Sequence, residues 1–121
     1  MNETTGDFKL FRNIFAAKCE KAVKPAFYRI KQKYERNFKN SKIKYSIDND
    51  MAEFLLVNFE STNSFRILYQ MNRPKVYVNI HYIGLDTPED ETFELSFTQL
   101  TPRTLCELLE KFITNCKTIG E

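Results

Sequence analysis

Residues 75–83, KVYVNIHYI, alternate with a period of two, and this pattern constrains the fold more than any other stretch. In an extended chain, successive side chains point to opposite faces. One face would carry Val76, Val78, Ile80 and Tyr82, and the other would carry Tyr77, Asn79, His81 and Ile83. The stretch therefore predicts a strand with one apolar face in the core and a second face of mixed polar and aromatic character.

Short runs rich in β-branched and aromatic residues flank this strand on both sides, separated by the turn-like stretches ESTNS, MNRP and GLDTPEDE. Such runs are typical of antiparallel strands joined by turns. We expect an antiparallel sheet of four to five strands over residues 43–98, with strands at Ile43–Ile47, Glu53–Phe59, Phe65–Tyr69, Lys75–Ile83 and Thr92–Thr98. The parity of the hairpin predicts that Arg66, Leu68 and Gln70 lie beside Tyr77, Asn79 and His81.

The N-terminal third has helical periodicity instead. Apolar residues recur at helical spacing from Phe8 onward, and Pro25 interrupts the pattern. Because proline removes a backbone donor and clashes with the preceding turn, we expect two helical pieces at 8–23 and 25–39, inside a basic helical segment spanning 8–40. Residues 1–7 are expected to form a short disordered lead.

The stretch FTQLTPRTLCELLEKF predicts that the last strand leads directly into a helix over 101–117. Thr101 can cap this helix, and Pro102 suits its first position. Apolar residues such as Leu105 and Leu109 form one stripe, so the helix is amphipathic and should pack on one sheet face. Together these elements predict a single α+β domain over residues 8–121.

Composition excludes several classes of protein. A chain of 121 residues with 42% hydrophobic and 28% charged residues is ordinary for a soluble domain, and no apolar run reaches the ~20 residues that cross a bilayer. The N-terminus lacks the layout of a signal peptide. We therefore expect an intracellular protein, nuclear if eukaryotic and otherwise cytoplasmic, with no membrane association.

Catalytic motifs are absent from the sequence. There is no phosphate-binding loop, the single histidine is His81, and the three cysteines, Cys19, Cys106 and Cys116, show no metal-ligand spacing. A pairing of His81 with a cysteine stays open, and the acidic residues could form either a metal cluster or, as we expect, a solvated loop. These residues are Asp86, Glu89, Asp90, Glu91 and Glu94. We expect reduced, structural cysteines, no cofactor and no enzymatic activity.

Charge is strongly segregated along the chain. Residues 9–44 contain twelve Lys or Arg against Glu20 and Glu35, a local charge of +10, so the rest carries −8 because the whole chain carries +2. Such segregation indicates a polyanion partner, an attraction between the two halves within or between subunits, or a solvated helix that is simply basic.

Residues 65–112 resemble the single-stranded-DNA-binding domain of the transcriptional coactivator positive cofactor four. The matching stretches are NRPKVYVNIHY, LDTPEDE and LTPRTLCELLEKF, in the order of that family. The resemblance places the family's turn lysines on Arg73 and Lys75, its strand cation on His81 and its turn aromatic on Asn72. Leu105 stands where the family has a tryptophan. The resemblance implies a homodimer whose C-terminal helices meet, through Leu109, Phe112, Ile113 and Cys116.

The first functional hypothesis is therefore binding of single-stranded nucleic acid, as a transcription or replication accessory factor. A cationic surface with exposed aromatic rings is what such binding requires. The predicted contacts are Arg66, Gln70, Arg73, Lys75, Tyr77 and His81 on the sheet, with Arg29, Lys31, Lys33 and Arg36 on the basic helix. The alternative is a non-catalytic protein-interaction module, such as an inhibitor, immunity or adaptor protein. A basic helix lying on an anionic membrane is a third reading.

Overall fold

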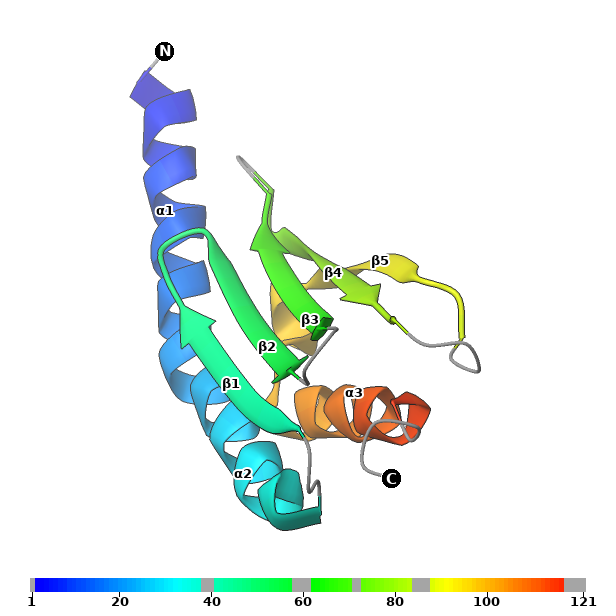
Figure 1. Ribbon diagram of the computed structural model, residues 1–121. Coiled ribbons are helices and arrows are strands. Elements are labelled where there is room, and N and C mark those ends of the chain that lie inside the picture. The colour runs from blue at the N-terminus through cyan, green and yellow to red at the C-terminus, as the bar shows by residue number, and fades with distance from the viewer. Residues whose placement is uncertain (1, 38–40, 58–61, 71–72, 84–87, 117–121) are drawn as a thin grey trace.

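The protein has an α+β fold, as the sequence predicted. A computed structural model describes residues 2–37, 41–57, 62–70, 73–83 and 88–116, with side chains described from residue 10 onward (Figure 1). Its helical elements are α1 (Asn2–Lys18), a π-helical turn (Cys19–Val23), α2 (Lys24–Tyr34), two 3-10 turns (Glu35–Asn37 and Phe97–Gln99) and α3 (Pro102–Asn115). Its strands are β1 (Lys42–Ile47), β2 (Met51–Val57), β3 (Thr62–Tyr69), β4 (Lys75–His81) and β5 (Glu91–Ser96).

The five strands form one antiparallel sheet in the order β1-β2-β3-β4-β5. Each strand pairs with the next along the chain, so short turns suffice to connect them. The register places Arg66 opposite Asn79 and Leu68 opposite Tyr77. Val76 and Val78 are fully buried, whereas Tyr77 is 39% exposed. The predicted assignment of faces in this hairpin is therefore confirmed.

The N-terminal helices follow one another without a gap as one helical run, Asn2–Tyr34, and α2 begins at Lys24, next to the boundary that Pro25 predicted. Its axis bends between α1 and α2 (Figure 1). The π-helical turn ends just before Pro25, which sits in the first turn of α2. A wider turn at this point accommodates a residue that cannot donate to the helix, so proline changes the winding without breaking the run. The run also begins at Asn2, where we had expected a disordered lead. The predicted helix end at residue 39 lies outside the described residues.

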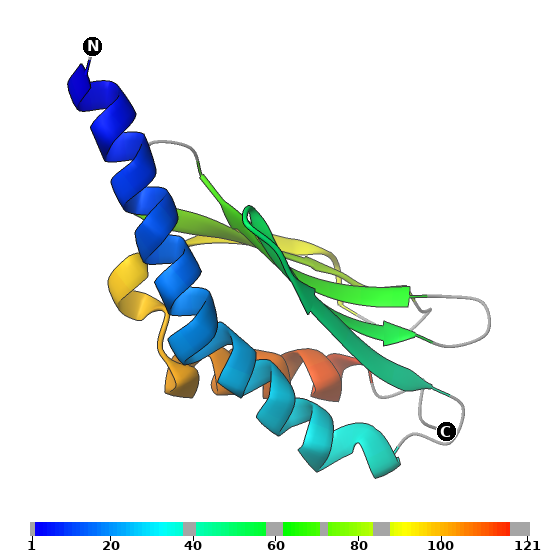
Figure 2. The same ribbon diagram turned by 90° about the vertical axis from the view of Figure 1, so that its left-hand side faces the viewer.

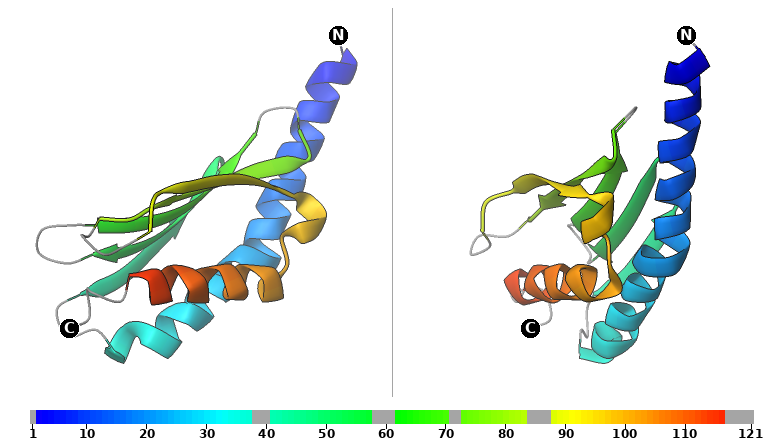
Figure 3. Two further views of the ribbon diagram at one scale, coloured as in Figure 1. Left: turned by 90° about the vertical axis from the view of Figure 1, so that its right-hand side faces the viewer. Right: turned by 180° about the vertical axis from the view of Figure 1, so that it is seen from behind.

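Both α3 and the helical run lie on the same side of the sheet, and among the described elements no helix lies over the opposite side (Figures 2 and 3). We call that uncovered side the open face. The first half of α1 extends beyond the edge of the sheet in the same views. Two-layer α+β domains of this kind bury one face of an antiparallel sheet and leave the other to solvent or to a partner.

An aromatic cluster joins the two layers. Phe112 of α3 contacts Phe54, Phe65 and Tyr82, with ring centroids 6.3, 5.9 and 5.8 Å away. Phe27 of α2 approaches Phe54 from the other helix at 5.3 Å. Edge-to-face and offset pairs of this kind add ~0.5–1.5 kcal/mol each beyond the area that they bury. The sheet, the helical run and α3 therefore share one core.

The junction between β5 and α3 matches the predicted helix start but is not direct. A 3-10 turn, Phe97–Gln99, separates the two elements, and Ser96 and Gln99 form a capping box around it. Thr101 then accepts a hydrogen bond from the backbone N–H of Thr104 at 3.2 Å. Leu100 is 1% exposed. The predicted cap is thus confirmed, and the extra turn aims α3 back beneath the sheet.

Candidate nucleic-acid interface

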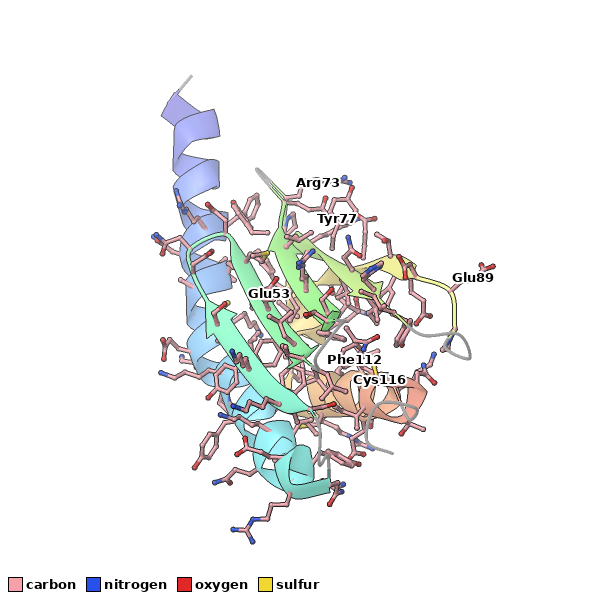
Figure 4. All side chains as sticks on the ribbon, viewed as in Figure 1. Glu53, Arg73, Tyr77, Glu89, Phe112 and Cys116 are labelled. Atoms are coloured by element: carbon pink, nitrogen blue, oxygen red, sulfur yellow. The ribbon has the colours of Figure 1, made fainter. Side chains whose placement is uncertain are left out.

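The predicted sheet residues share the open face, but their charges are largely neutralised. Arg66 on β3 lies 2.6 Å from Glu53 of β2. Tyr77 lies on β4 in the row that also holds Met51 and Leu68. Figure 4 shows Tyr77 and Arg73 toward one end of this face, with Glu53 farther along the sheet. The face therefore contains an exposed ring, but its central cation already has a carboxylate partner.

The turn residues at that end of the sheet are also engaged. Gln70 is 7% exposed and donates to Glu94 at 2.8 Å, while Arg73 lies 3.9 Å from the same carboxylate. The hydrogen bond from Gln70 lowers the pKa of Glu94, and the nearby charges of Lys75 and Arg73 lower it further. Glu94 therefore stays ionised and offsets the cations of the hairpin turn.

His81 has a similar partner at the far end of β4. Its Nδ1 lies 2.6 Å from Asp90, whose other carboxylate oxygen accepts the backbone N–H of Tyr82. The hydrogen bond with His81 is the main cause that lowers the pKa of Asp90. No group of three potential metal ligands occurs in the described part of the chain, and Asp86 lies outside it. His81 thus holds the start of the β4–β5 connection in place.

The helical run carries cations that are less compensated. We call Lys24, Arg29, Lys31, Lys33 and Arg36 the basic face. Lys24 and Lys31 lie 3.9 and 3.5 Å from glutamates one helical turn away, in exposed pairs that contribute little. Within the described residues, Arg29 and Arg36 form no ion pair, and both are exposed. This surface therefore presents more uncompensated positive charge than the open face.

An exposed tyrosine that the sequence reasoning missed lies at the centre of the basic face. Tyr28 is 52% exposed, and its hydroxyl accepts a hydrogen bond from Gln32 at 2.7 Å. Lys31 and Arg36 line the same hollow as Tyr28, together with Gln32 and with Glu35, the partner of Lys31. The helical pattern could have revealed this residue, because Phe27 and Ile30 face the core and leave Tyr28 on the opposite side.

A second hollow, of about 600 Å³, lies between α2 and α3. Arg29, Lys33 and Arg103 line it together with Glu107 and Glu110. Lys33 forms an ion pair with Glu110, and Tyr34 donates to the same carboxylate at 3.2 Å. The hydrogen bond from Lys33 is the largest cause that lowers the pKa of Glu110. Glu110 is thus the acidic residue of α3 that engages the basic face.

The predicted dimer residues lie inside a single protomer. Leu109, Phe112 and Cys116 are fully buried, and Ile113 is 4% exposed. Their apolar surface already packs under the sheet of the same chain, because α3 covers that sheet. These side chains therefore pack within one protomer, and the homodimer stays a prediction.

The cysteines are free thiols in the structure. Burial raises the pKa of Cys19 and of Cys116 to about 12. Burial is also the main cause that raises the pKa of the half-buried Cys106, with opposing contributions from Arg29 and Lys33. A raised pKa keeps a thiol protonated and poorly nucleophilic.

Comparison with known proteins identifies no relative whose function could be considered for this chain. No family model, curated protein or solved structure matches the chain. The resemblance to positive cofactor four therefore stays a prediction. Among the described residues, no helix is long and apolar enough to cross a membrane.

Proposed function

We propose that the protein binds single-stranded nucleic acid through the basic face, as a non-catalytic accessory factor in transcription or replication. The observation that carries this proposal is the contrast between two surfaces. Arg29 and Arg36 are exposed and without ion pairs among the described residues, whereas Arg66, Arg73 and His81 each lie within 4 Å of a carboxylate. A polyanion gains most where the cations have no competing partner.

Tyr28 supplies the second requirement of single-strand binding. Every unpaired base has an apolar face, and stacking on an aromatic side chain contributes roughly 1–3 kcal/mol per base without strict sequence preference. Tyr28 is exposed, and its hydrogen bond with Gln32 limits how far the ring can turn. Phosphates on either side of the stacked base would meet Lys24, Lys31 and Arg36, which surround this ring on the helix.

The hairpin cations would act as secondary contacts in this proposal. Lys75 is half-buried at the start of β4, and Arg73 is exposed beside it. Both are close enough to influence the charge state of Glu94. A nucleic acid that reached them would have to displace or repel this carboxylate, so the sheet adds less affinity than the helix does.

Charge reversal on the two surfaces tests the proposal. The variant Arg29→Glu/Arg36→Glu and its control Arg73→Glu/Lys75→Glu change the net charge equally. Measured by fluorescence anisotropy with a labelled oligothymidine, the helix variant should bind at least about tenfold more weakly. Its salt slope should be lower by roughly 1.4, at about 0.7 for each lost phosphate contact. The control should lose less than about threefold. A larger loss in the control would move the site to the sheet, and equal losses would reduce the effect to overall charge.

A protein-interaction module is the second candidate, and the open face favours it. Met51, Leu68 and Tyr77 form one apolar row across β2, β3 and β4, and none of the helices that the structure describes covers this row. Aromatic and methionine side chains are enriched in protein interfaces. If this candidate is correct, Tyr77→Arg should abolish partner binding while the affinity for nucleic acid does not fall.

A further inference from the structure

A groove of about 310 Å³ runs between the helical run and the start of α3. Its floor consists of Ala22 and Leu100, which are 2% and 1% exposed. Ile14 and Ala17 form the wall on the helical run, and Pro102 belongs to the opposite wall. The groove exists because alanines, rather than larger residues, stand at positions 17 and 22 of the helical run. Its volume is near the lower end of the ~300–1,000 Å³ typical of ligand pockets.

The rim of this groove is positively charged. Among the residues that the structure describes, Lys18 and Lys21 are the charged residues that line it, and no carboxylate does. Within the described residues, neither lysine forms an ion pair. Ile14, Lys18 and Lys21 stand at helical spacing, so the two lysines follow the apolar wall along one face. An occupant would therefore meet an apolar floor and unpaired cations along one side.

We propose that this groove docks a short acidic segment of a partner protein, anchored by one or two large apolar side chains. The charge at the rim selects carboxylates, while an apolar side chain would be buried against the accessible walls formed by Ile14, Ala17 and Pro102. A nucleic acid fits this groove less well than it fits the basic face. The phosphates of a nucleic acid would pair with the lysines, but a nucleic acid has no aliphatic side chain to fill the groove. The groove and the basic face would thus let one chain bridge a nucleic acid and an acidic protein.

Two exposed alanines on α1 provide matched variants for a test. Ala17 lines the groove, whereas its neighbour Ala16 is exposed and does not line it. Replacing either one with tryptophan adds the same volume and no charge. The sequence contains no tryptophan, so each variant carries a single indole reporter. Because the groove accepts an apolar side chain, fluorescence of Ala17→Trp should be blue-shifted relative to that of Ala16→Trp.

Selection from a random short-peptide library identifies what the groove binds. With the wild-type protein as bait, the retained peptides should be enriched in Asp and Glu together with Leu, Ile or Phe. Ala17→Trp should lose these peptides at least about tenfold in affinity, and Ala16→Trp should keep them. Lys18→Glu/Lys21→Glu should remove the preference for acidic residues. Both tryptophan variants should bind oligothymidine as the wild type does, so this test is independent of the nucleic-acid proposal.

Three results would overturn the proposal. The first is a library selection that yields no acidic and apolar peptides. The second is retention of such peptides by Ala17→Trp with the wild-type affinity. The third is identical emission spectra of the two tryptophan variants, because the groove would then accept no apolar side chain. Peptides that are purely acidic and insensitive to Ala17→Trp would show that the lysines act without the groove.

Discussion

Single residues decide whether the helix or the sheet would hold a base. Tyr28 is 52% exposed between cations of the helical run, and Tyr77 is 39% exposed on the open face beside Leu68. The two rings are chemically identical, but the hollow that Tyr28 lines also holds Arg36, which forms no ion pair among the described residues, whereas Tyr77 lies directly opposite Glu94. Comparing them therefore isolates the surroundings of the ring from the ring itself.

Tyr28→Ala should weaken single-strand binding by about 1–3 kcal/mol, the usual cost of losing one stacked base. Tyr77→Ala should change it by less than about 0.5 kcal/mol, within the range typical of exposed substitutions. Isothermal calorimetry with an oligothymidine measures both values. The assignment of the stacking residue would be reversed if the loss occurred with Tyr77→Ala instead.

Burial of two thiols makes the stability of the folded protein depend on pH in the alkaline range. The pKa of Cys19 and of Cys116 is raised from 9.0 to about 12 in the folded protein. A group whose pKa is raised on folding stabilises the fold fully below its unfolded pKa, and this contribution is lost as pH rises toward the folded value. Stability should therefore decline between pH 9 and about pH 12.

Urea unfolding at pH 8 and pH 10 tests this dependence. Each thiol should account for about 1.4 kcal/mol of the loss at pH 10, one unit above its ordinary pKa. The variant Cys19→Ala/Cys116→Ala will be less stable throughout because it leaves two small cavities. It should nevertheless show a shallower decline with pH. Equal declines in both proteins would show that other groups cause the loss.

At the scale of elements, the contact between α2 and α3 limits how much of the basic face is free. Glu110 of α3 binds Lys33 and Tyr34, and the charge of Arg29 also contributes to its lowered pKa. Glu107 lines the same hollow but pairs with Arg103 of its own helix, at 3.3 Å. The two glutamates therefore carry equal charge in different arrangements.

Glu110→Gln should increase the affinity for single strands and steepen the salt slope by roughly 0.7, because Lys33 becomes free for one more phosphate contact. Glu107→Gln removes the same charge and should increase affinity less. Anisotropy titrations at several salt concentrations compare the two. If both variants gained equally, the ion pair with Lys33 would have no specific effect.

Sequence patterns predicted these elements unevenly, for physical reasons. Period-two alternation fixed the faces of β3 and β4, since a shift of one residue would expose Val76 and Val78. The helix cap at Thr101 was also predictable, because it depends only on residues next to it in the sequence. The π-helical turn before Pro25 was not predictable, because an interruption by proline is compatible with a break, a kink or a wider turn. Pairing of Arg66 with Glu53 depends on the register between strands, which the sequence did not specify.

At the scale of the whole molecule, the helices form one layer that covers one face of the sheet and leaves the open face uncovered by any described helix. We placed Leu109 and Phe112 at a dimer interface by resemblance, but α3 lies under the sheet of its own chain and buries both. The charge segregation, by contrast, is not absorbed within the protomer. In the described part of the chain, only two ion pairs join the basic N-terminal segment to the acidic remainder, those of Arg12 with Asp50 and of Lys33 with Glu110. The greater part of that positive charge is therefore not paired with the acidic remainder.

The salt dependence of single-strand binding by the wild-type protein tests the central claim most directly. Anisotropy of a labelled oligothymidine, titrated at a series of KCl concentrations from about 50 mM upward, gives the slope of log K against log salt. Contacts from the four cations of the basic face other than Lys33, which Glu110 engages, predict a straight line with a slope of roughly −3, at about 0.7 for each phosphate. An absence of affinity at the lowest salt, or a slope shallower than about −1, would contradict binding of nucleic acid by this surface.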